Sequence, residues 1–244
     1  MMRELLSRAL RKMARVVSGE PPPPIEITDE FLTWLLFANA GMLHPGNPYL
    51  MDYAIAHLPS DAPILEIGSF CGLSANVLVH LKRKHGRKNL LFTCDKWEFE
   101  RPQVACIPDS NVSFASYKKL VRESFFRNIE TFSRDNRPFT IEAFSDEFFA
   151  MWRQNQTVTD VFHRPALLGG PLSFCYVDGN HTYDGVKADF QNCDAFLQVG
   201  GFILFDDSAW EYFGVRRMMP EVLATGRYRL VARNPHHLFQ KIKA

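Results

Sequence analysis

The stretch "ILEIGSFCGLSANVL", from Ile64 to Leu78, decides the fold of this 244-residue chain. Its apolar beginning is typical of a buried strand, and the residues from Gly72 onward have the character of a helix. Gly68 allows the sharp turn that ends the strand, and Gly72 allows a ligand or another backbone segment to come close. The first amides of such a helix and the Ser74 hydroxyl can hold an anionic group, and a carboxylate serves as well as a phosphate.

The glycine spacing of this loop separates it from two common nucleotide-binding motifs. Dinucleotide folds use G-x-G-x-x-G, whereas this loop is G-x-x-x-G and has Phe70 where the middle glycine would stand. The sequence contains no Gly-Lys-Ser or Gly-Lys-Thr triplet, which excludes a P-loop. Taken alone, G-x-x-x-G is also typical of ordinary packing between a helix and a strand.

Four further apolar runs follow and alternate with helical stretches: "NLLFTCD", "FTIEAFSD", "SFCYVDG" and "GFILFDD". This alternation predicts an α/β fold with a Rossmann-like, doubly wound, mainly parallel sheet of the seven-stranded type. Each run ends in Ser, Asp or Gly, and ligands of such sheets bind beyond the carboxyl ends of the strands. The C-terminal runs "RYRLVAR" and "HLFQKIK", joined by "NPH", predict an antiparallel hairpin at the sheet edge. We interpret His236 and His237 in this hairpin as structural.

The polar strand ends offer the groups that a nucleoside-containing ligand needs. Asp95 ends the second run and can accept two hydrogen bonds from ribose hydroxyls. Ser145 and Asp146 end the third run, where an adenine edge can be recognised. Trp97 is a candidate to cover the adenine, although a Trp packed at the surface explains the sequence equally well. With the carboxylate-binding loop, these groups describe S-adenosylmethionine, and the expected contacts are Glu66, Gly68, Ser69, Phe70, Gly72, Ser74, Asp95, Trp97, Ser145 and Asp146.

Three carboxylates are expected at the neighbouring ends of the fourth and fifth runs, namely Asp178, Asp206 and Asp207. They would repel one another, so that either one is protonated or a cation lies among them. Oxygen ligands alone favour Mg²⁺ or Ca²⁺, and Mn²⁺ is also compatible. Aspartates at strand ends also serve as helix caps, which is the alternative interpretation.

The order of these motifs resembles that of class I methyltransferases. The pattern E-x-G-x-x-x-G-x-S, present as Glu66, Gly68, Gly72 and Ser74, is similar to that of metal-dependent small-molecule O-methyltransferases of the catechol type. The later segment "VDGNHTYDGVKADF…GGFILFDD" resembles a related group that includes antibiotic-sugar O-methyltransferases. The resemblance covers roughly residues 63–223.

The resemblance implies a site and a reaction. Asp178, Asp206 and Asp207 would hold a divalent metal, most simply Mg²⁺, which binds the acceptor hydroxyl and lowers its pKa. Asp178 and His181 would be the catalytic pair, with His181 as general base and a loop scaffold as its alternative role. The expected reaction is methyl transfer from S-adenosylmethionine to a hydroxyl of a sugar, polyol or phenol. The alternatives are a metal-free methyltransferase that uses His181 alone, a metal-dependent hydrolase, and a non-catalytic cofactor-binding module.

The first 60 residues resemble neither of these two groups of methyltransferases. Residues 1–24 predict a basic amphipathic helix and a Pro-rich linker, and residues 25–60 predict helices, one beginning at Thr28, that can form a lid. Residues 61–244 form the expected catalytic domain. Residues 1–17 are compatible with docking on the same chain or a second copy, with contact to an anionic membrane, or with a targeting segment.

The composition excludes several other classes of protein. A formal net charge of +1 gives no overall field for nucleic acid, and the five Cys lack paired spacing, which favours buried, reduced thiols at Cys94 and Cys175. No apolar run approaches the roughly 20 residues of a membrane span, and no secretory signal is recognisable. A cytoplasmic protein with a small-molecule partner is therefore expected, whose acceptor the sequence does not identify.

Overall fold

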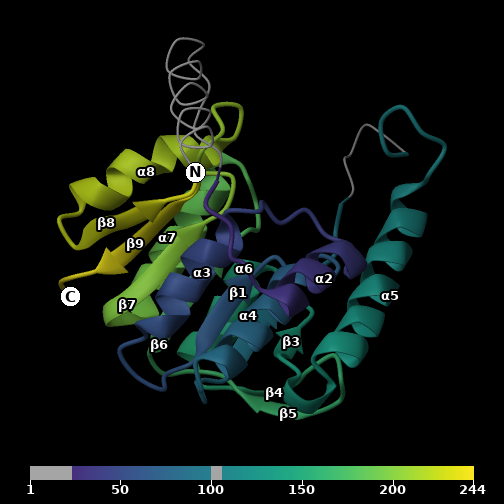
Figure 1. Cartoon of the computed structure of the whole chain (residues 1–244), viewed down its shortest axis with the longest axis horizontal. Helices are drawn as coiled ribbons and strands as arrows, with labels where there is room; N and C mark the ends of the chain where they lie inside the picture. The colour runs from purple at the N-terminus through teal and green to yellow at the C-terminus, as the bar shows by residue number, and fades with distance from the viewer. Residues whose placement is uncertain (1–23, 100–105) are drawn as a thin grey trace, which may run out of the picture.

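The computed structural model describes residues 24–99 and 106–244, and a seven-stranded sheet lies at its centre (Figure 1). Five of its strands are parallel: β1 (Ile64–Ile67), β2 (Leu91–Cys94), β3 (Phe139–Ile141), β6 (Leu172–Val177) and β7 (Leu197–Phe205). The strand order is β3-β2-β1-β6-β7, followed by the two C-terminal strands. The prediction of a Rossmann-like, mainly parallel α/β sheet is confirmed, and β1 lies between the two halves of the doubly wound arrangement.

The C-terminal hairpin completes the sheet and is also confirmed. It consists of β8 (Tyr228–Arg233) and β9 (His237–Lys241), and β9 inserts between β7 and β8, antiparallel to both. His237 pairs with Phe205, the last residue of β7. The turn before β9 therefore lies at the carboxyl edge of the parallel strands, where ligands of such sheets bind.

Both faces of the sheet are buried, because successive strand side chains point to opposite sides. In β6, Phe174 and Tyr176 belong to one core, whereas Cys175 and Val177 belong to the other. The first face is covered by α2 (Glu30–Ala38), α3 (Asn47–Ala56) and α4 (Leu73–Lys84). The second face is covered by α6 (Ser145–Arg153), α7 (Tyr183–Phe196) and α8 (Gly214–Ala224). The long α5 (Phe114–Phe132), followed by η1 (Arg134–Asn136), packs beside α4 (Figure 1).

Three local features differ from the sequence-based expectation. The first helix is capped by Asp29 instead of Thr28, because the Asp29 carboxylate accepts a hydrogen bond from the Leu32 amide (2.9 Å). Ser145 begins α6 and does not end β3, which stops at Ile141. A separate hairpin, β4 (Thr157–Thr159) and β5 (Pro165–Leu167), was not expected.

The start of the described chain is fastened to the C-terminal hairpin. The backbone N–H and C=O of Ile25 both bond to the side-chain amide of Asn234 (2.7 Å each), and the same amide donates to Gly46 O (3.0 Å). The predicted basic helix of residues 1–17 lies outside the described residues. The segment of α2 and α3 packs on α4, and whether it acts as a lid stays a prediction.

Two further expectations concern compartment and thiols. All five cysteines are free, and Cys94 and Cys175 are buried, as predicted. Among the helices of residues 24–99 and 106–244, none combines the length and the apolar character needed to cross a bilayer. The cytoplasmic location stays a prediction.

Candidate active site

A cavity of about 770 Å³ opens at the carboxyl ends of the parallel strands. Segments that follow β1, β2, β3, β6 and β7 contribute to it in turn, and its volume is typical of a small-molecule site. The predicted site residues that line it are Gly68, Ser69, Phe70, Ser74, Asp95, Ser145, Asp178, His181, Asp206 and Asp207. The fold therefore brings together most of the groups that the sequence singled out.

The two glycines of the loop after β1 have different reasons to be glycine. Gly68 has a φ of 86°, and a Cβ there would lie 2.0 Å from the carbonyl oxygen of Asp178, so only glycine lets the loop pass the end of β6. Gly72 has a φ of 82° at the beginning of α4, and a Cβ there would meet Phe125 at 3.1 Å. Gly72 thus serves packing against α5, and it does not line the cavity.

Asp95 holds the glycine loop in place. Its Oδ2 accepts hydrogen bonds from the amides of Ser69 and Phe70 (2.8 Å each), and its Oδ1 accepts one from the Trp97 amide (2.6 Å). Burial raises the pKa of Asp95, although these three backbone bonds act in the opposite direction. The carboxylate therefore shapes the loop and also borders the cavity.

Trp97 lies behind the cavity wall instead of lining it. The side chain is fully buried, packs on Phe125 with ring centroids 5.1 Å apart, and donates from Nε1 to the Phe70 carbonyl (2.9 Å). We therefore do not expect Trp97 to cover an adenine ring. The aromatic side chains that line the cavity near the ends of β2 and β3 are Phe70, Phe99, Tyr117 and Phe144.

Glu66 is buried beneath the loop without a hydrogen-bond partner. Both of its carboxylate oxygens lack a partner among the described residues, as does the buried hydroxyl of Ser69. Burial raises the pKa of Glu66 to about 8. Glu66 does not line the cavity, so of these groups only the Ser69 hydroxyl is placed to meet the ammonium group of an amino-acid ligand such as S-adenosylmethionine. Asp146 does not line the cavity, and its carboxylate accepts a bond from the next amide of α6 (2.9 Å).

His181 lies between two of the three predicted acidic residues. Its Nε2 is 3.5 Å from Asp178 Oδ1, and its Nδ1 is 3.1 Å from Asp207 Oδ2. One candidate ligand atom each from Asp178, His181 and Asp207 lies within 4.8 Å of the others, which is close enough to surround a metal ion. Burial, together with the negative charges of Asp206 and Asp207, raises the pKa of Asp178. The repulsion expected from the sequence is therefore present at this site.

Asp206 differs from the other two acids because protein donors occupy both of its oxygens. Oδ1 lies 2.5 Å from His236 Nδ1 and accepts hydrogen bonds from Asn47 Nδ2 (2.8 Å) and the Asp207 amide (2.9 Å). Oδ2 accepts from the Tyr176 hydroxyl (2.7 Å). Burial favours the neutral acid, but the bonds from His236, Asn47 and Tyr176 lower the pKa of Asp206 to about 2. Sequence reasoning missed Asn47 and Tyr176, and it did not connect His236 with the acidic residues.

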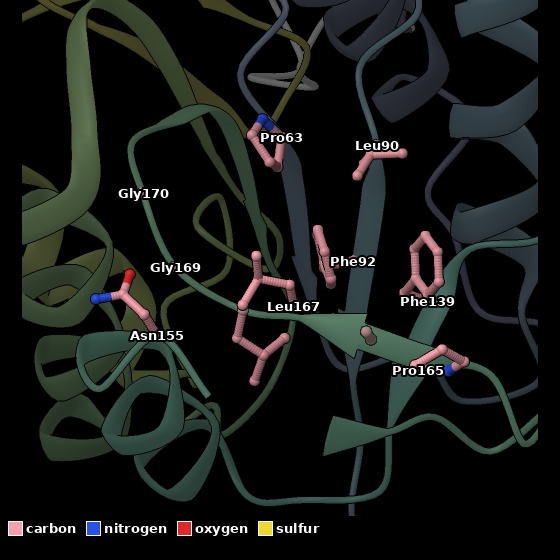
Figure 2. A pocket seen from close by; sticks show the side chains of 11 residues that line it. Pro63, Leu90, Phe92, Phe139, Asn155, Pro165, Leu167, Gly169 and Gly170 are labelled. Carbon is pink, nitrogen blue, oxygen red and sulfur yellow. The ribbon is translucent and has the colours of Figure 1, made fainter. Parts of the chain in front are cut away.

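A second cavity, of about 440 Å³, opens at the opposite edge of the sheet (Figure 2). It lies where β1, β2 and β3 begin, next to the hairpin of β4 and β5, and its walls include Leu90, Phe92, Phe139 and Leu167. Asn155 is the only polar side chain among the described residues that line it. Without an ionisable group, this cavity offers no acid–base or metal chemistry, so the candidate active site is the first one.

Comparisons with known proteins agree with this placement. A family model described as a methyltransferase domain matches residues 65–208, which is more than half of the chain. This range runs from β1 to the residue after Asp207 and contains both the glycine loop and the acidic residues. Among curated proteins, no match to the sequence is found.

Solved structures show the same fold at low sequence identity. An O-methyltransferase from Bacillus cereus in complex with SAH aligns with a TM-score of 0.56 and 14% identity, covering 89% of this chain and 92% of that chain. The O-methyltransferase TomG from Streptomyces achromogenes, in complex with SAM, aligns with a TM-score of 0.54 and 15% identity, covering 90% of this chain and 92% of that chain. CalS11, a TDP-rhamnose 3'-O-methyltransferase, aligns with a TM-score of 0.51 and 15% identity, covering 96% of this chain and 93% of that chain.

Proposed function

Because the chain belongs to the methyltransferase-domain family that its residues 65–208 match, we propose that it transfers a methyl group from S-adenosylmethionine to a hydroxyl of a small molecule. One observation carries the proposal: the cavity joins the glycine loop with its clamping Asp95 at one end to Asp178, His181 and Asp207 at the other. A donor-binding half and an acid–base half thus share one cavity.

The donor-binding half uses the loop and the ends of β2 and β3. The Ser69 hydroxyl lines the cavity without a partner among the described residues and can meet the ammonium group of the donor, while the amides at the beginning of α4 can meet its carboxylate. Beyond its three amide bonds, Asp95 has one acceptor site left for a ribose hydroxyl, and Ser145 contacts the adenine. Structural neighbours crystallised with SAH or SAM support this donor at the level of the fold.

The acid–base half prepares the acceptor. His181 takes the proton of the acceptor hydroxyl, and Asp178 and Asp207 hold the imidazole between them. The acceptor oxygen then forms the new C–O bond as the bond between sulfur and methyl breaks, and the electron pair of that bond stays on sulfur. The products are a methyl ether and S-adenosylhomocysteine, and His181 later releases its proton to water. The enzyme contributes chiefly by aligning the two substrates.

We further propose that a divalent cation assists this step, Mg²⁺ being the simplest choice. All three acids line the cavity, but only Asp178 and Asp207 are proposed as ligands, because the oxygens of Asp206 are already hydrogen-bonded to protein donors. The proposal thus gives Asp206 a supporting role, whereas the sequence-based expectation was a ligand set of Asp178, Asp206 and Asp207. When bound, the cation would lower the pKa of the acceptor hydroxyl as a Lewis acid.

The metal-free mechanism is the second candidate, and one contact favours it. His181 lies between Asp178 and Asp207, so that the imidazolium formed when His181 takes the acceptor proton is balanced by both carboxylates without an ion. A metal-dependent hydrolase would need neither the glycine loop nor Asp95, and the family match disfavours it.

Titration calorimetry with S-adenosylmethionine tests the donor site. The full chain should bind the donor, and Asp95→Ala should weaken binding at least tenfold, because hydrogen bonds to a charged group contribute roughly 1.5–3 kcal/mol each. Asp146→Ala is the matched control, since Asp146 lies outside the cavity. Equal affinities of wild type and Asp95→Ala would refute the donor site. Repeating the titration with Mg²⁺ and with EDTA shows whether donor binding itself depends on the cation.

A further inference from the structure

The helix α2 carries apolar side chains on both its inner and its outer face. Leu32 and Leu35 point inward and are buried in the core that α2 shares with α4. On the outer face, Trp34 is 52% exposed and Phe37 is 92% exposed, and Met42, in the segment after α2, is 79% exposed. The sequence from Trp34 to Met42 contains no charged residue. A helix that is apolar on both faces is expected to be covered on both of them.

These exposed side chains, which we call the α2 patch (Trp34, Phe37 and Met42), lie next to the candidate active site. Met42 lines the active-site cavity. Trp34 is held in place by α5, because its ring meets Phe132 edge-on with centroids 5.1 Å apart. The patch faces outward, where α2 lies over α4 (Figure 1). Exposed Trp, Phe and Met side chains gathered in this way are typical of a surface that binds a protein or a lipid.

The chain before the α2 patch carries a concentration of positive charge. Residues 1–17 lie outside the described residues, but their sequence predicts a helix with an apolar face and a basic face. The segment contains a single acid, Glu4, and such a composition is typical of helices that lie on anionic membranes. The basic residues are Arg3, Arg8, Arg11, Lys12 and Arg15.

The linker keeps these cations within reach of the α2 patch. Ile25 is bonded to Asn234 through both its N–H and its C=O, and α2 begins soon afterwards at Glu30. Residues 18–24 span about 22 Å in the polyproline conformation that their prolines favour. A helix of residues 1–17 would be about 26 Å long, roughly twice the length of α2, so α2 cannot cover its apolar face. Both apolar surfaces therefore need a further partner.

We propose that the chain docks on an anionic lipid surface, with the α2 patch in the headgroup region and the cations of residues 1–17 on the lipid phosphates. Binding of this kind grows with the apolar area inserted and with the attraction to anionic lipids. A second copy of the chain can also cover the α2 patch, but its formal net charge of +1 offers no excess of negative charge to these cations. Because Met42 lines the cavity, docking places the mouth of the cavity at the lipid surface. The inference goes beyond the proposed function and does not depend on it.

Sedimentation of the full chain with vesicles tests the apolar contribution. We expect binding to phosphatidylcholine vesicles that contain about 30% phosphatidylserine. Phe37→Ser should weaken this binding about three- to tenfold, because it removes an inserted ring. The matched control is Leu167→Ser, since Leu167 is an exposed apolar side chain at the opposite edge of the sheet.

The same assay tests the contribution of charge. Binding to vesicles of phosphatidylcholine alone should be at least tenfold weaker, because each cation near an anionic surface strengthens binding about fivefold. Arg8→Gln combined with Arg11→Gln should weaken binding to the anionic vesicles at least tenfold. Lys88→Gln combined with Lys243→Gln is the control, since it removes two exposed cations elsewhere on the chain.

Trp34 reports insertion directly. Brominated lipid in the anionic vesicles should quench the Trp fluorescence, and Trp34→Phe should remove most of the quenching, because Trp97 and Trp152 are buried in the core. Equal binding of wild type and Phe37→Ser, or quenching that is unchanged in Trp34→Phe, would overturn the lipid contact of the α2 patch. Absence of binding to anionic vesicles would overturn the whole proposal. A lower mass of Phe37→Ser than of wild type in light scattering would then assign the patch to a second copy.

Discussion

His181 contacts two carboxylates at once, and this allows single substitutions to separate the two proposed mechanisms. Asp207→Ala should abolish stimulation of turnover by Mg²⁺ while leaving donor affinity nearly unchanged, because Asp207 lies at the acceptor half of the cavity. His181→Ala should keep the stimulation but lose roughly 10²–10⁴-fold in rate, and it should recover partly at higher pH as the hydroxyl ionises unaided. Steady-state rates with and without EDTA provide the measurement.

The control for both substitutions is Asp146→Ala, which removes a carboxylate outside the cavity. If EDTA leaves the wild-type rate unchanged while His181→Ala still abolishes it, the metal-free mechanism is correct. In that case the carboxylates orient the imidazole and do not bind a cation.

His236 is expected to act on the rate through Asp206, without touching either substrate. His236→Phe removes the donor to a buried carboxylate, and breaking such a pair costs about 3–5 kcal/mol of the free energy of unfolding. The rate should fall while donor affinity stays constant, because Asp206 supports the amide of Asp207. His236→Asn keeps a side-chain N–H donor and should restore part of the rate. Comparing kcat with donor affinity in the two variants separates positioning from loss of fold.

The matched control is His237→Phe, since His237 bonds to Ser208 and not to Asp206. Equal rates for His236→Phe and wild type would show that Asp206 needs no partner in this position.

The residues around Asp206 show which part of the site could not be predicted from the sequence. Asp178, Asp206 and Asp207 could be predicted because they follow apolar runs, and parallel strands end at one edge. Asn47 and His236 reach Asp206 from a helix and a turn that are far away in sequence, and neither follows a recognisable motif. Trp97 shows the reverse error: its place after Asp95 suggested a ligand contact, whereas its size and apolar character put it in the core.

At the scale of elements, α7 has a buried acid that is not part of the cavity. Asp189 is 2% exposed, and burial raises its pKa to about 6, although its bond to the Ser145 hydroxyl lowers it. Since the pKa in the unfolded chain is about 3.8, the folded protein binds more protons between these values, and its stability should fall as the pH rises from about 4 to 6. Ionised Asp189 thus costs about 3 kcal/mol at neutral pH.

Asp189→Asn should remove this pH dependence and raise the free energy of unfolding at pH 7–8 by up to about 3 kcal/mol. Urea unfolding at pH 4, 6 and 8 measures the free energy of unfolding of both proteins. The control is Asp184→Asn, at an exposed position of the same helix. A variant that is less stable than wild type at pH 8 would show that the Ser145 bond outweighs the cost of burial.

The parallel strands could be predicted from the sequence, whereas one hairpin and one helix start could not. The five parallel strands are continuous apolar runs because helices cover both of their faces, and this pattern identifies them in the sequence. The hairpin of β4 and β5 was missed because its strands have three residues each and are partly exposed, so that no apolar run marks them. The start of α2 was misplaced by one residue because Thr28 and Asp29 are both good caps, and only the bond to Leu32 distinguishes them.

Across the whole molecule, the turn before β9 connects three distant parts of the chain. Asn234 binds Ile25 and Gly46, and the neighbouring His236 binds Asp206 and Asn47. The first described residues, the beginning of α3 and the acidic end of β7 therefore share one buried support. Truncations that remove Ile25 should therefore affect the active site through this turn. Truncations that end before Ile25 should leave the active site unchanged.

Two truncations test that boundary. Removing residues 1–23 leaves both Ile25 bonds in place and should change Tm by less than about 2 °C. Removing residues 1–27 deletes these bonds and also the packing of Ile27 on the core beneath α2, α3 and α4. This should lower the free energy of unfolding by about 2 kcal/mol and Tm by roughly 4–8 °C at this chain length. Calorimetry gives Tm, and light scattering after gel filtration gives the mass. A loss of oligomeric mass on removing residues 1–23 alone would mean that residues 1–17 dock on a second copy, and vesicle pelleting of the full chain would reveal a membrane contact instead.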